Sequence, residues 1–197
     1  LRPFDEADAV AAARWFRQHG ITTIGVCFLH SYANDRHELA MREVLRREHP
    51  DAVVSISAEV LREYREYERS MTTLVDAAVK PKLSRYVNNI KMRLNAYASS
   101  QAERQVPFYV MKSNGGVTSA ETAARQAIHT ALSGPAAGVI GAVSVAHSAG
   151  FSNIISIDVG GTSADICLVR DRQPEITKEA KIGPFPLKIP IIDINTI

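Results

Sequence analysis

The chain has 197 residues, of which 46% are hydrophobic and 22% charged, and its length suits one domain or two small ones. The 23 Lys and Arg residues nearly balance the 21 Asp and Glu residues, which leaves a formal net charge of +2. Because the basic residues are scattered among acidic ones and form no basic aromatic platform, we expect a soluble globular protein with no nucleic-acid partner.

The first sixty residues alternate between helical and strand patterns. Asp5 can cap a first helix that Gly20 ends, and a second helix is expected over residues 35–48. Residues 21–29 and 52–57 are predicted to be strands that are apolar on both faces, as in a parallel sheet covered by helices. This alternation predicts an α/β fold.

The chain changes character after residue 57, because the segment LREYREYERS (61–70) is dense in charge and tyrosine. Two apolar stripes with helical spacing follow it. The first comprises Met71, Leu74, Val75 and Ala78, and the second comprises Leu83, Tyr86, Val87, Ile90, Leu94 and Tyr97. Pro81 lies between the stripes and is expected to break or kink the helix. Residues 98–105 are predicted to be a loop.

A strand is expected over residues 106–111, and the turn SNGG (113–116) follows it. The segment LSGPAAGVIGAVSVAHSAG (132–150) then predicts a helix that Ser133 caps. Two interpretations of this helix stay open. Its small residues allow close packing, and its amino end, at Ser133 and Gly134, can also face a phosphate.

Residues 126–157 contain no Asp, Glu, Lys or Arg. A membrane-spanning helix needs about 20 predominantly apolar residues, and polar residues interrupt this stretch, so we expect a buried helix and strand and no membrane span. Cys27 and Cys167 lie inside apolar runs, which predicts buried free thiols and a cytoplasmic location.

The segment DVGGTSAD (158–165) shows the clearest chemical pattern in the chain. Apolar runs precede and follow it, so a β-hairpin is expected over residues 154–170. The GxxxxGK[ST] pattern of a Walker loop is absent. A plain tight turn without a ligand is one interpretation, and phosphate binding is the other.

Several features of this bend favour phosphate binding. Gly160 and Gly161 are expected to adopt positive φ, so that consecutive N–H groups converge on an anion. Thr162 and Ser163 can add hydroxyl donors.

Asp158 and Asp165 flank the bend, although a hairpin needs neither of them. Carboxylates beside a phosphate repel it unless a cation lies between them. The pattern therefore implies Mg²⁺ that is held largely through water.

The order of these elements resembles the actin, sugar kinase and heat-shock chaperone ATPase superfamily. In this order, a helix of small residues is followed by an apolar strand, the segment DxGGTxxD and a second strand. The chain is more closely similar to the hydantoinase A / 5-oxoprolinase family, which includes N-methylhydantoinase and acetone carboxylase subunits. The similar segments are VCFLHSYAND (26–35), EYERSMTTLVDAAVKP (66–81), KSNGGVTSAETAA (112–124), LSGPAAGVIGA (132–142) and IDVGGTSADICLV (157–169).

The resemblance implies a fragment of an actin-like (ribonuclease H-like) ATPase fold, with a mixed sheet and flanking helices. It also implies an ATP- and Mg²⁺-dependent hydrolase that phosphorylates the carbonyl of a cyclic amide, or of a ketone, for ring opening or carboxylation. Asp158 is then expected to hold Mg²⁺ or its waters, and residues 160–163 to cradle the β- and γ-phosphates. Asp165 supports the metal shell or orients an attacking group, and both roles stay open.

The same resemblance predicts the domain organisation. Residues 1–60 are expected to end an amino-terminal domain, and residues 61–197 to begin a second one with a helical connector at 65–98. The first phosphate hairpin and the adenine pocket are expected outside this chain, so the chain by itself is expected to be inactive. A hydantoinase B-type subunit is the expected partner.

Two alternatives to an enzyme of this family stay open. One is a nucleotide-dependent switch or a sugar kinase of the same superfamily. The other is a scaffold subunit whose hairpin no longer binds nucleotide.

Overall fold

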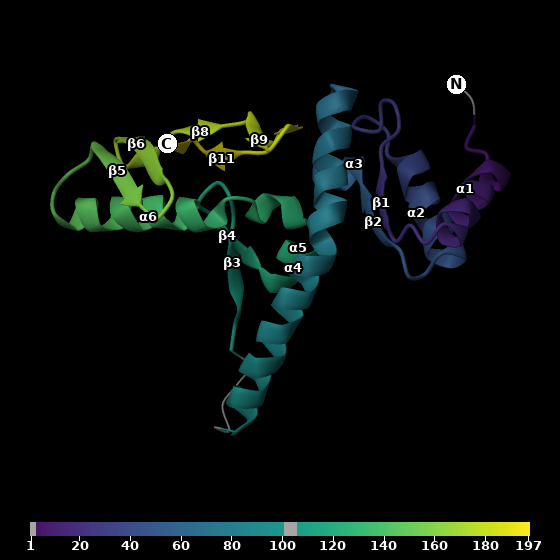
Figure 1. Cartoon of the computed structure of the whole chain (residues 1–197), viewed down its shortest axis with the longest axis horizontal. Coiled ribbons are helices and arrows are strands. Elements are labelled where there is room, and N and C mark those ends of the chain that lie inside the picture. Colours follow the sequence, from purple (N-terminus) through teal and green to yellow (C-terminus); the bar gives the residue numbers. More distant parts are fainter. Residues whose placement is uncertain (1–2, 101–105) are drawn as a thin grey trace. The chain divides into compact units, whose positions relative to one another are not determined.

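The computed structural model describes residues 3–100 and 106–197 (Figure 1). Contacts divide the chain into two units, and the boundary between them falls within a long helix. Unit 1 runs to Tyr86 and adds Arg125–Ile128 and Lys181–Lys188. Unit 2 comprises Val87–Ala124, His129–Ala180 and Ile189–Ile197. The domain boundary expected near residue 60 stays a prediction.

Unit 1 begins with the predicted α/β alternation. Its elements are α1 (Glu6–Gln18), β1 (Thr23–Val26), α2 (Arg36–Glu48) and β2 (Val53–Ile56). The two strands pair in parallel with Thr23 opposite Val53, and apolar side chains from both helices and both strands form one core. These observations confirm the α/β class.

The first helix begins and ends as its residue pattern predicts. The side chain of Asp5 accepts hydrogen bonds from the N–H groups of Ala7 and Asp8, which otherwise have no partner in the first turn. Gly20 follows the helix with φ of 65°, a left-handed conformation that costs glycine little.

A short helix α3 (Ser57–Val60) precedes the long helix α4 (Glu66–Ser100). The expected break at Pro81 is wrong, because α4 continues through this residue. Proline removes one backbone hydrogen bond, and a helix of 35 residues retains many others. The loop predicted for residues 98–105 is wrong up to Ser100, and the rest of it lies outside the described residues.

The first half of α4 buries a polar face in place of the expected apolar stripe. Arg69, Thr72, Thr73 and Asp76 are fully buried, whereas Leu74 of the predicted stripe is 48% exposed. The hydroxyl groups of Thr72 and Thr73 donate to backbone carbonyls one turn earlier in the helix. Asp76 accepts hydrogen bonds from Ser55 of β2 and from the N–H of Ile128. Hydrogen bonds inside unit 1 therefore satisfy most of this polar face, although Nε of Arg69 is buried without a partner among the described residues.

A chain of hydroxyl groups links two buried charges in this unit. The guanidinium of Arg69 donates to Ser31 Oγ at 2.6 Å and to the carbonyl of Phe28 at 2.7 Å. Ser31 Oγ lies 3.0 Å from Ser57 Oγ, and Ser57 donates to the carboxylate of Glu38 at 2.6 Å. Glu38 is fully buried and also accepts hydrogen bonds from the N–H groups of Phe28 and Ala58, while Arg69 lies 3.7 Å from the carboxylate of Glu66.

Unit 2 contains most of the remaining strands. Its main elements are β3 (Tyr109–Met111), β4 (Val117–Ser119), α5 (Ala120–Arg125), α6 (Ser133–Ser148), β5 (Ile154–Val159), β6 (Ala164–Arg170), β7 (Gln173–Pro174), β8 (Ile176–Thr177), β11 (Ile191–Ile192) and β12 (Asn195–Thr196). A 3₁₀ turn at Ala127–Thr130 precedes α6. The short strands β9 (Ala180–Ile182) and β10 (Phe185–Leu187) pair with each other and lie almost entirely in the Lys181–Lys188 segment of unit 1. The predicted turn at residues 113–116 joins β3 and β4, with Gly115 at φ of 81°.

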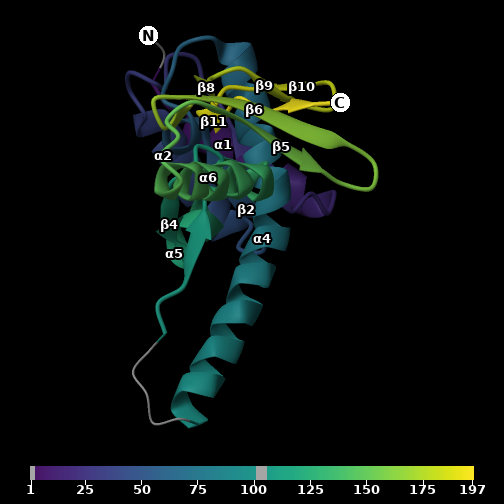
Figure 2. The same ribbon diagram turned by 90° about the vertical axis from the view of Figure 1, so that its left-hand side faces the viewer.

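The helix α6 packs against one face of the antiparallel pair β5–β6, as Figures 1 and 2 show. Strand β6 lies between β5 and β12, and Ala136, Val139, Cys167 and Val169 form the core between sheet and helix. Cys167 is the buried free thiol that was expected, and burial raises its pKa, with the charges of Asp193 and Glu175 adding to the effect. Cys27 is also free but only half-buried.

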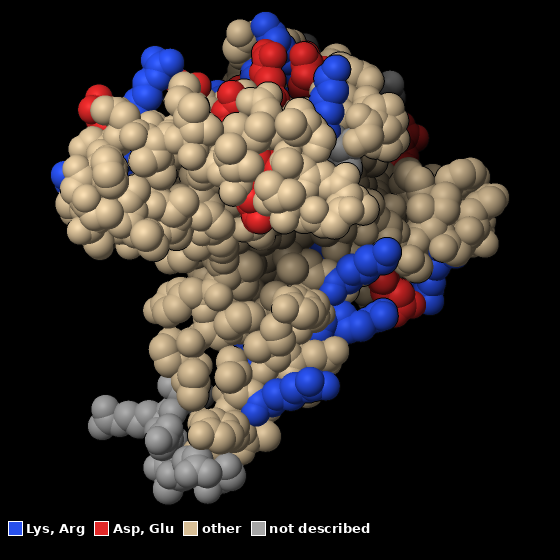
Figure 3. Space-filling view, turned by 60° about the vertical axis from the view of Figure 1, so that its left-hand side comes forward, with Lys and Arg blue, Asp and Glu red and all other residues tan. Residues whose placement is uncertain are grey.

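No described helix combines the length and the apolar character needed to cross a bilayer. The second half of α4 carries Lys82, Arg85, Lys91 and Arg93 and no acidic residue. Figure 3 shows basic side chains on the lower part of the face it draws, with acidic side chains beside some of them, and both signs of charge on the upper part.

The buried charge of Arg69 gives a prediction about stability. Arg69→Met should lower the free energy of unfolding by about 1–3 kcal/mol, because it removes the guanidinium that donates to the buried Ser31 hydroxyl and to the Phe28 carbonyl. Arg85→Met is the matched control, since Arg85 is exposed on the same helix, and it should change stability by less than about 0.5 kcal/mol. Denaturant unfolding measures both variants. An equal loss of unfolding free energy in Arg69→Met and Arg85→Met would show that the buried guanidinium of Arg69 does not stabilise unit 1.

Candidate functional site

The segment DVGGTSAD forms the predicted hairpin. Strands β5 and β6 pair with Asp158 directly opposite Asp165 and Val159 opposite Ala164, so residues 160–163 make a four-residue bend. Gly160, Gly161 and Thr162 are exposed, and Ser163 is half-buried. The bend between β5 and β6 is visible in Figure 2. Its surface is therefore open to a ligand within unit 2.

The amide groups of the bend are mostly unengaged. The N–H of Gly160 donates to the carbonyl of Ser163 at 2.9 Å and closes the turn. Within the described residues, the N–H groups of Gly161, Thr162 and Ser163 donate to no other group. Three consecutive free donors suit an anion, whereas the N–H of Gly160 is already engaged within the turn, so a phosphate contact of Gly160 stays a prediction.

Gly160 and Gly161 leave the bend uncovered because they have no side chain, and neither adopts a left-handed backbone. Neither Gly160 nor Gly161 has positive φ, so that expectation is wrong. A Cβ atom on Gly161 would meet no described atom within 4 Å, and one on Gly160 would make only an ordinary contact with the Ser163 carbonyl at 3.5 Å. The fold alone therefore does not require glycine at position 161, whereas a ligand that approaches the backbone does.

Asp158 and Asp165 lie on the same face of the sheet. Residues directly opposite each other in an antiparallel pair point to one side, and this is the side on which Cys167 packs against α6. Asp158 is exposed and Asp165 half-buried, and neither pairs with a Lys or Arg among the described residues. Two like charges in this position destabilise a strand pair, so a bound cation would relieve a real repulsion.

The helix α6 leaves room beside these carboxylates. Oδ2 of Asp158 lies 3.9 Å from the position that a Cβ on Gly138 would take. Gly134 precedes Gly138 by four residues, about 6 Å along the axis, and so lies on the same face of the helix. A Cβ on Gly134 would also meet no described atom within 4 Å. The structure thus brings the predicted residues Gly134 and Asp158 to one side of α6.

The expected cap of this helix is wrong in detail. Ser133 is the first helical residue and makes no side-chain capping bond, while Leu132 occupies the cap position in a left-handed conformation with φ of 56°. The N–H groups of Ser133 and Gly134 have no partner in the described part of the chain, as is usual for a first helical turn. This amino end can therefore still offer donors to an anion.

The donor set fits a hydrated Mg²⁺ ion better than a metal held by protein alone. Among the described residues, no group of three or more His, Cys, Asp or Glu is arranged to hold a metal ion. Mg²⁺ usually takes one or two carboxylates and completes its shell with water and phosphate oxygens. Asp158 and Asp165 supply that number of carboxylates, and the open bend leaves space for the phosphate.

Two partners of the aspartates were missed by the sequence interpretation. Thr196 of β12 donates its hydroxyl to Oδ1 of Asp165 at 2.7 Å, and Gly138 faces Asp158. The Thr196 contact joins residues 31 positions apart, so no local pattern could have shown it. The run of small residues in α6 was a sequence pattern from which the close approach of Gly138 to another element could have been predicted.

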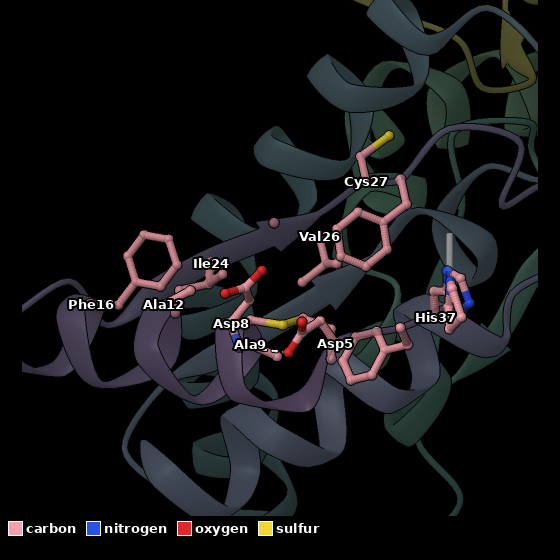
Figure 4. A pocket seen from close by; sticks show the side chains of 14 residues that line it. Asp5, Asp8, Ala9, Ala12, Phe16, Ile24, Val26, Cys27 and His37 are labelled. Atoms are coloured by element: carbon pink, nitrogen blue, oxygen red, sulfur yellow. Dashed lines mark hydrogen bonds between the residues drawn. The ribbon is translucent and has the colours of Figure 1, made fainter. Parts of the chain in front are cut away.

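A separate cavity of about 500 Å³ lies entirely in unit 1. Figure 4 shows its labelled residues, which come mainly from α1 and from the strand β1. Its lining is mostly apolar, and Asp5 at its rim already caps α1. The cavity includes none of the predicted site residues, so we do not assign the chemistry to it.

Comparisons with known proteins agree along the whole chain. A family model described as hydantoinase/oxoprolinase matches residues 69–197, and one described as hydantoinase/oxoprolinase N-terminal region matches residues 1–49. The caprolactamase subunit alpha of Pseudomonas jessenii is 30% identical over 99% of this chain, which corresponds to 27% of that protein. The 5-oxoprolinase of Saccharomyces cerevisiae is 30% identical over 98% of this chain and 14% of its own length.

Solved structures show the same similarity. The crystal structure of the ATP-dependent caprolactamase from Pseudomonas jessenii superposes with a TM-score of 0.84 over 100% of this chain and 28% of that one, at 30% identity. A nucleotide-free structure of acetone carboxylase, described with a mechanism of ATP-dependent acetone carboxylation, superposes with a TM-score of 0.79. The match covers 99% of this chain and 27% of that one, at 28% identity. The chain spans less than a third of the length of these relatives.

The open space at Gly161 separates folding from ligand binding. Gly161→Ala should leave the free energy of unfolding unchanged or raise it by up to about 1 kcal/mol, because the backbone is not left-handed and the methyl group meets no described atom. The same methyl group should weaken binding of Mg·ATP at least tenfold, as measured by nucleotide titration.

Gly141→Ala is the control, since a Cβ there also meets no described atom and position 141 lies outside the predicted site. It should bind nucleotide like the unmodified protein. Full nucleotide affinity in the Gly161→Ala variant would contradict the phosphate-binding role of the bend.

Proposed function

The chain belongs to the hydantoinase/oxoprolinase family, as its motifs predicted, and we propose that it contributes a phosphate-binding hairpin to an ATP-dependent enzyme of this family. The proposed enzyme phosphorylates the carbonyl of a cyclic amide or a ketone, and ring-opening hydrolysis or carboxylation then consumes the activated compound. The observation that carries this proposal is the exposed bend with three free amides beside two opposed carboxylates.

The relatives support an enzyme over the alternatives. They are named as a caprolactamase, a 5-oxoprolinase and an acetone carboxylase, and the solved caprolactamase is described as ATP-dependent. The first two names describe the opening of a cyclic amide. We therefore favour a cyclic amide substrate over a ketone, and an enzyme over a nucleotide-dependent switch or a sugar kinase.

The proposed reaction begins with transfer of the γ-phosphoryl group. The carbonyl oxygen of the substrate forms a bond to the γ-phosphorus, and the bond from that phosphorus to the bridging oxygen of ADP breaks. Catalysis of such a transfer depends mainly on positioning and on neutralising charge. The amides of Gly161, Thr162 and Ser163 would bind phosphate oxygens, and the amino end of α6 adds two further donors.

Hydrolysis completes the reaction for a cyclic amide. A first water adds to the activated carbon, and the C–N bond of the ring breaks with a proton passing to the nitrogen, which leaves an acyl phosphate. A second water hydrolyses this acyl phosphate to the carboxylate and inorganic phosphate. The sum is cyclic amide, ATP and two waters giving the open amino acid, ADP and phosphate. Nothing in this step requires an oxidant or a reductant.

The proposed metal has a limited and defined role. When bound, Mg²⁺ would neutralise the negative charge of the phosphates. Asp158 would hold this ion or its waters, and the free face of α6 at Gly138 leaves space for them. The paired carboxylates of Asp158 and Asp165 thereby become compatible with a neighbouring phosphate.

The relatives also suggest a partner. They include a caprolactamase subunit alpha and an acetone carboxylase beta subunit, which are components of larger assemblies by name. We propose that the native polypeptide containing this chain acts with a second, B-type subunit. The substrate assay therefore needs both polypeptides.

The function is tested with the complete native polypeptide that contains this chain, with and without its partner subunit. Hydantoin, 5-oxoproline, caprolactam and acetone are each incubated with Mg·ATP, and release of ADP is measured. We expect release to depend on one class of these substrates.

Asp158→Asn should reduce this substrate-dependent rate on the order of 100-fold, because charge stabilisation at the transferred group is lost. Asp171→Asn is the matched control, since Asp171 follows the far end of β6, and it should keep the full rate. An Asp158→Asn variant with the unmodified rate would exclude the hairpin from the reaction.

A further inference from the structure

Asp165 is held from both of its neighbouring strands. Strand β6 lies between β5 and β12, so Asp165 is directly opposite Asp158 on one side and Thr196 on the other. Residues opposite each other in antiparallel pairs share a face, which places all three side chains on the α6 side of the sheet. The hydroxyl of Thr196 donates to Oδ1 of Asp165 at 2.7 Å.

The backbone fixes the position of Thr196. The N–H of Ile197 donates to the carbonyl of Ala164 at 3.0 Å, and the N–H of Ala164 donates to the carbonyl of Ile197 at 2.8 Å. This reciprocal pair stands directly beside the Thr196–Asp165 contact. The register of β12 on β6 is thus locked at the residue that begins β6, immediately after the bend.

The hydroxyl contact leaves the two oxygens of Asp165 in different situations. Oδ1 accepts from Thr196, whereas Oδ2 accepts no hydrogen bond from the described residues. Asp158, directly opposite, accepts none either, and its Oδ2 faces the open position at Gly138. The hydroxyl of Thr196 on β12 therefore holds the carboxylate of Asp165, while Oδ2 of Asp165 stays available on the face that it shares with Asp158.

We infer that Thr196 is a positioning residue that orients Asp165 toward the hydrated divalent cation bound beside Asp158. This inference rests on the proposed function and deepens it. It assigns Asp165 to the metal shell, where the sequence left open a second role of orienting an attacking group. Outer-shell hydrogen bonds of this kind orient metal-binding carboxylates and change metal affinity strongly.

A purely structural role is the competing explanation. A hydroxyl–carboxylate pair between neighbouring strands stabilises a sheet by itself, by a few tenths of a kcal/mol up to about 1 kcal/mol. Such a role would change the unfolding midpoint without changing metal affinity. Metal binding and stability are therefore measured separately on the same variants.

The test uses Mn²⁺ as the spectroscopic probe of the site, in the complete native polypeptide with a saturating non-hydrolysable ATP analogue. Thr196→Val keeps the β-branched shape and removes the hydroxyl, and it should weaken Mn²⁺ binding about 10-fold. Thr196→Ser restores the hydroxyl and should bind Mn²⁺ within twofold of the unmodified protein. Thr177→Val, the same change in β8, is the matched control and should have no effect on Mn²⁺ affinity.

Asp158→Asn separates failure of this inference from failure of the proposed function. If Asp158→Asn weakens Mn²⁺ binding but Thr196→Val does not, Asp158 binds metal and the positioning role of Thr196 is wrong. If neither substitution changes Mn²⁺ affinity, the metal site and this inference both fail. A loss in Thr196→Val that Thr196→Ser does not restore would also overturn the inference, because the hydroxyl would not be its cause.

Discussion

The repulsion between Asp158 and Asp165 is the constraint that explains this part of the molecule. The two carboxylates lie directly opposite each other on neighbouring strands, and no Lys or Arg of the described chain pairs with them. A sheet selected for stability alone would not keep like charges in this arrangement. Under the proposed function, a cation that arrives with a phosphate ligand would remove this repulsion.

The surroundings of these carboxylates are consistent with that explanation. The bend between β5 and β6 presents three free amide donors, and α6 presents glycines on the face near Asp158. Thr196 donates to Asp165 from the other side of β6 without covering the bend. Contacts from α6, β5 and β12 therefore shape one open position, although these elements are distant in the sequence.

Local patterns predicted the elements well and their tertiary roles less well. The cap at Asp5, the turn at Gly115 and the β5–β6 hairpin follow from short-range chemistry, and all three are confirmed. The buried polar face of α4 was missed because helical periodicity locates apolar residues, whereas Arg69 and Asp76 are buried through partners on other elements. The Thr196–Asp165 contact was missed because it depends on pairing between β6 and β12, and the positions of the free amides depend on turn geometry that glycine content alone does not determine.

Amide hydrogen exchange at the bend tests the central claim most directly. In the complete native polypeptide, exchange at Gly161, Thr162 and Ser163 is measured with Mg²⁺ alone and with Mg²⁺ and a non-hydrolysable ATP analogue. The account predicts rapid exchange without nucleotide at these three amides, which donate no hydrogen bond within the described residues, and clear protection when the analogue binds. Unchanged exchange at saturating analogue would show that the triphosphate binds elsewhere, and it would contradict the assignment of the hairpin.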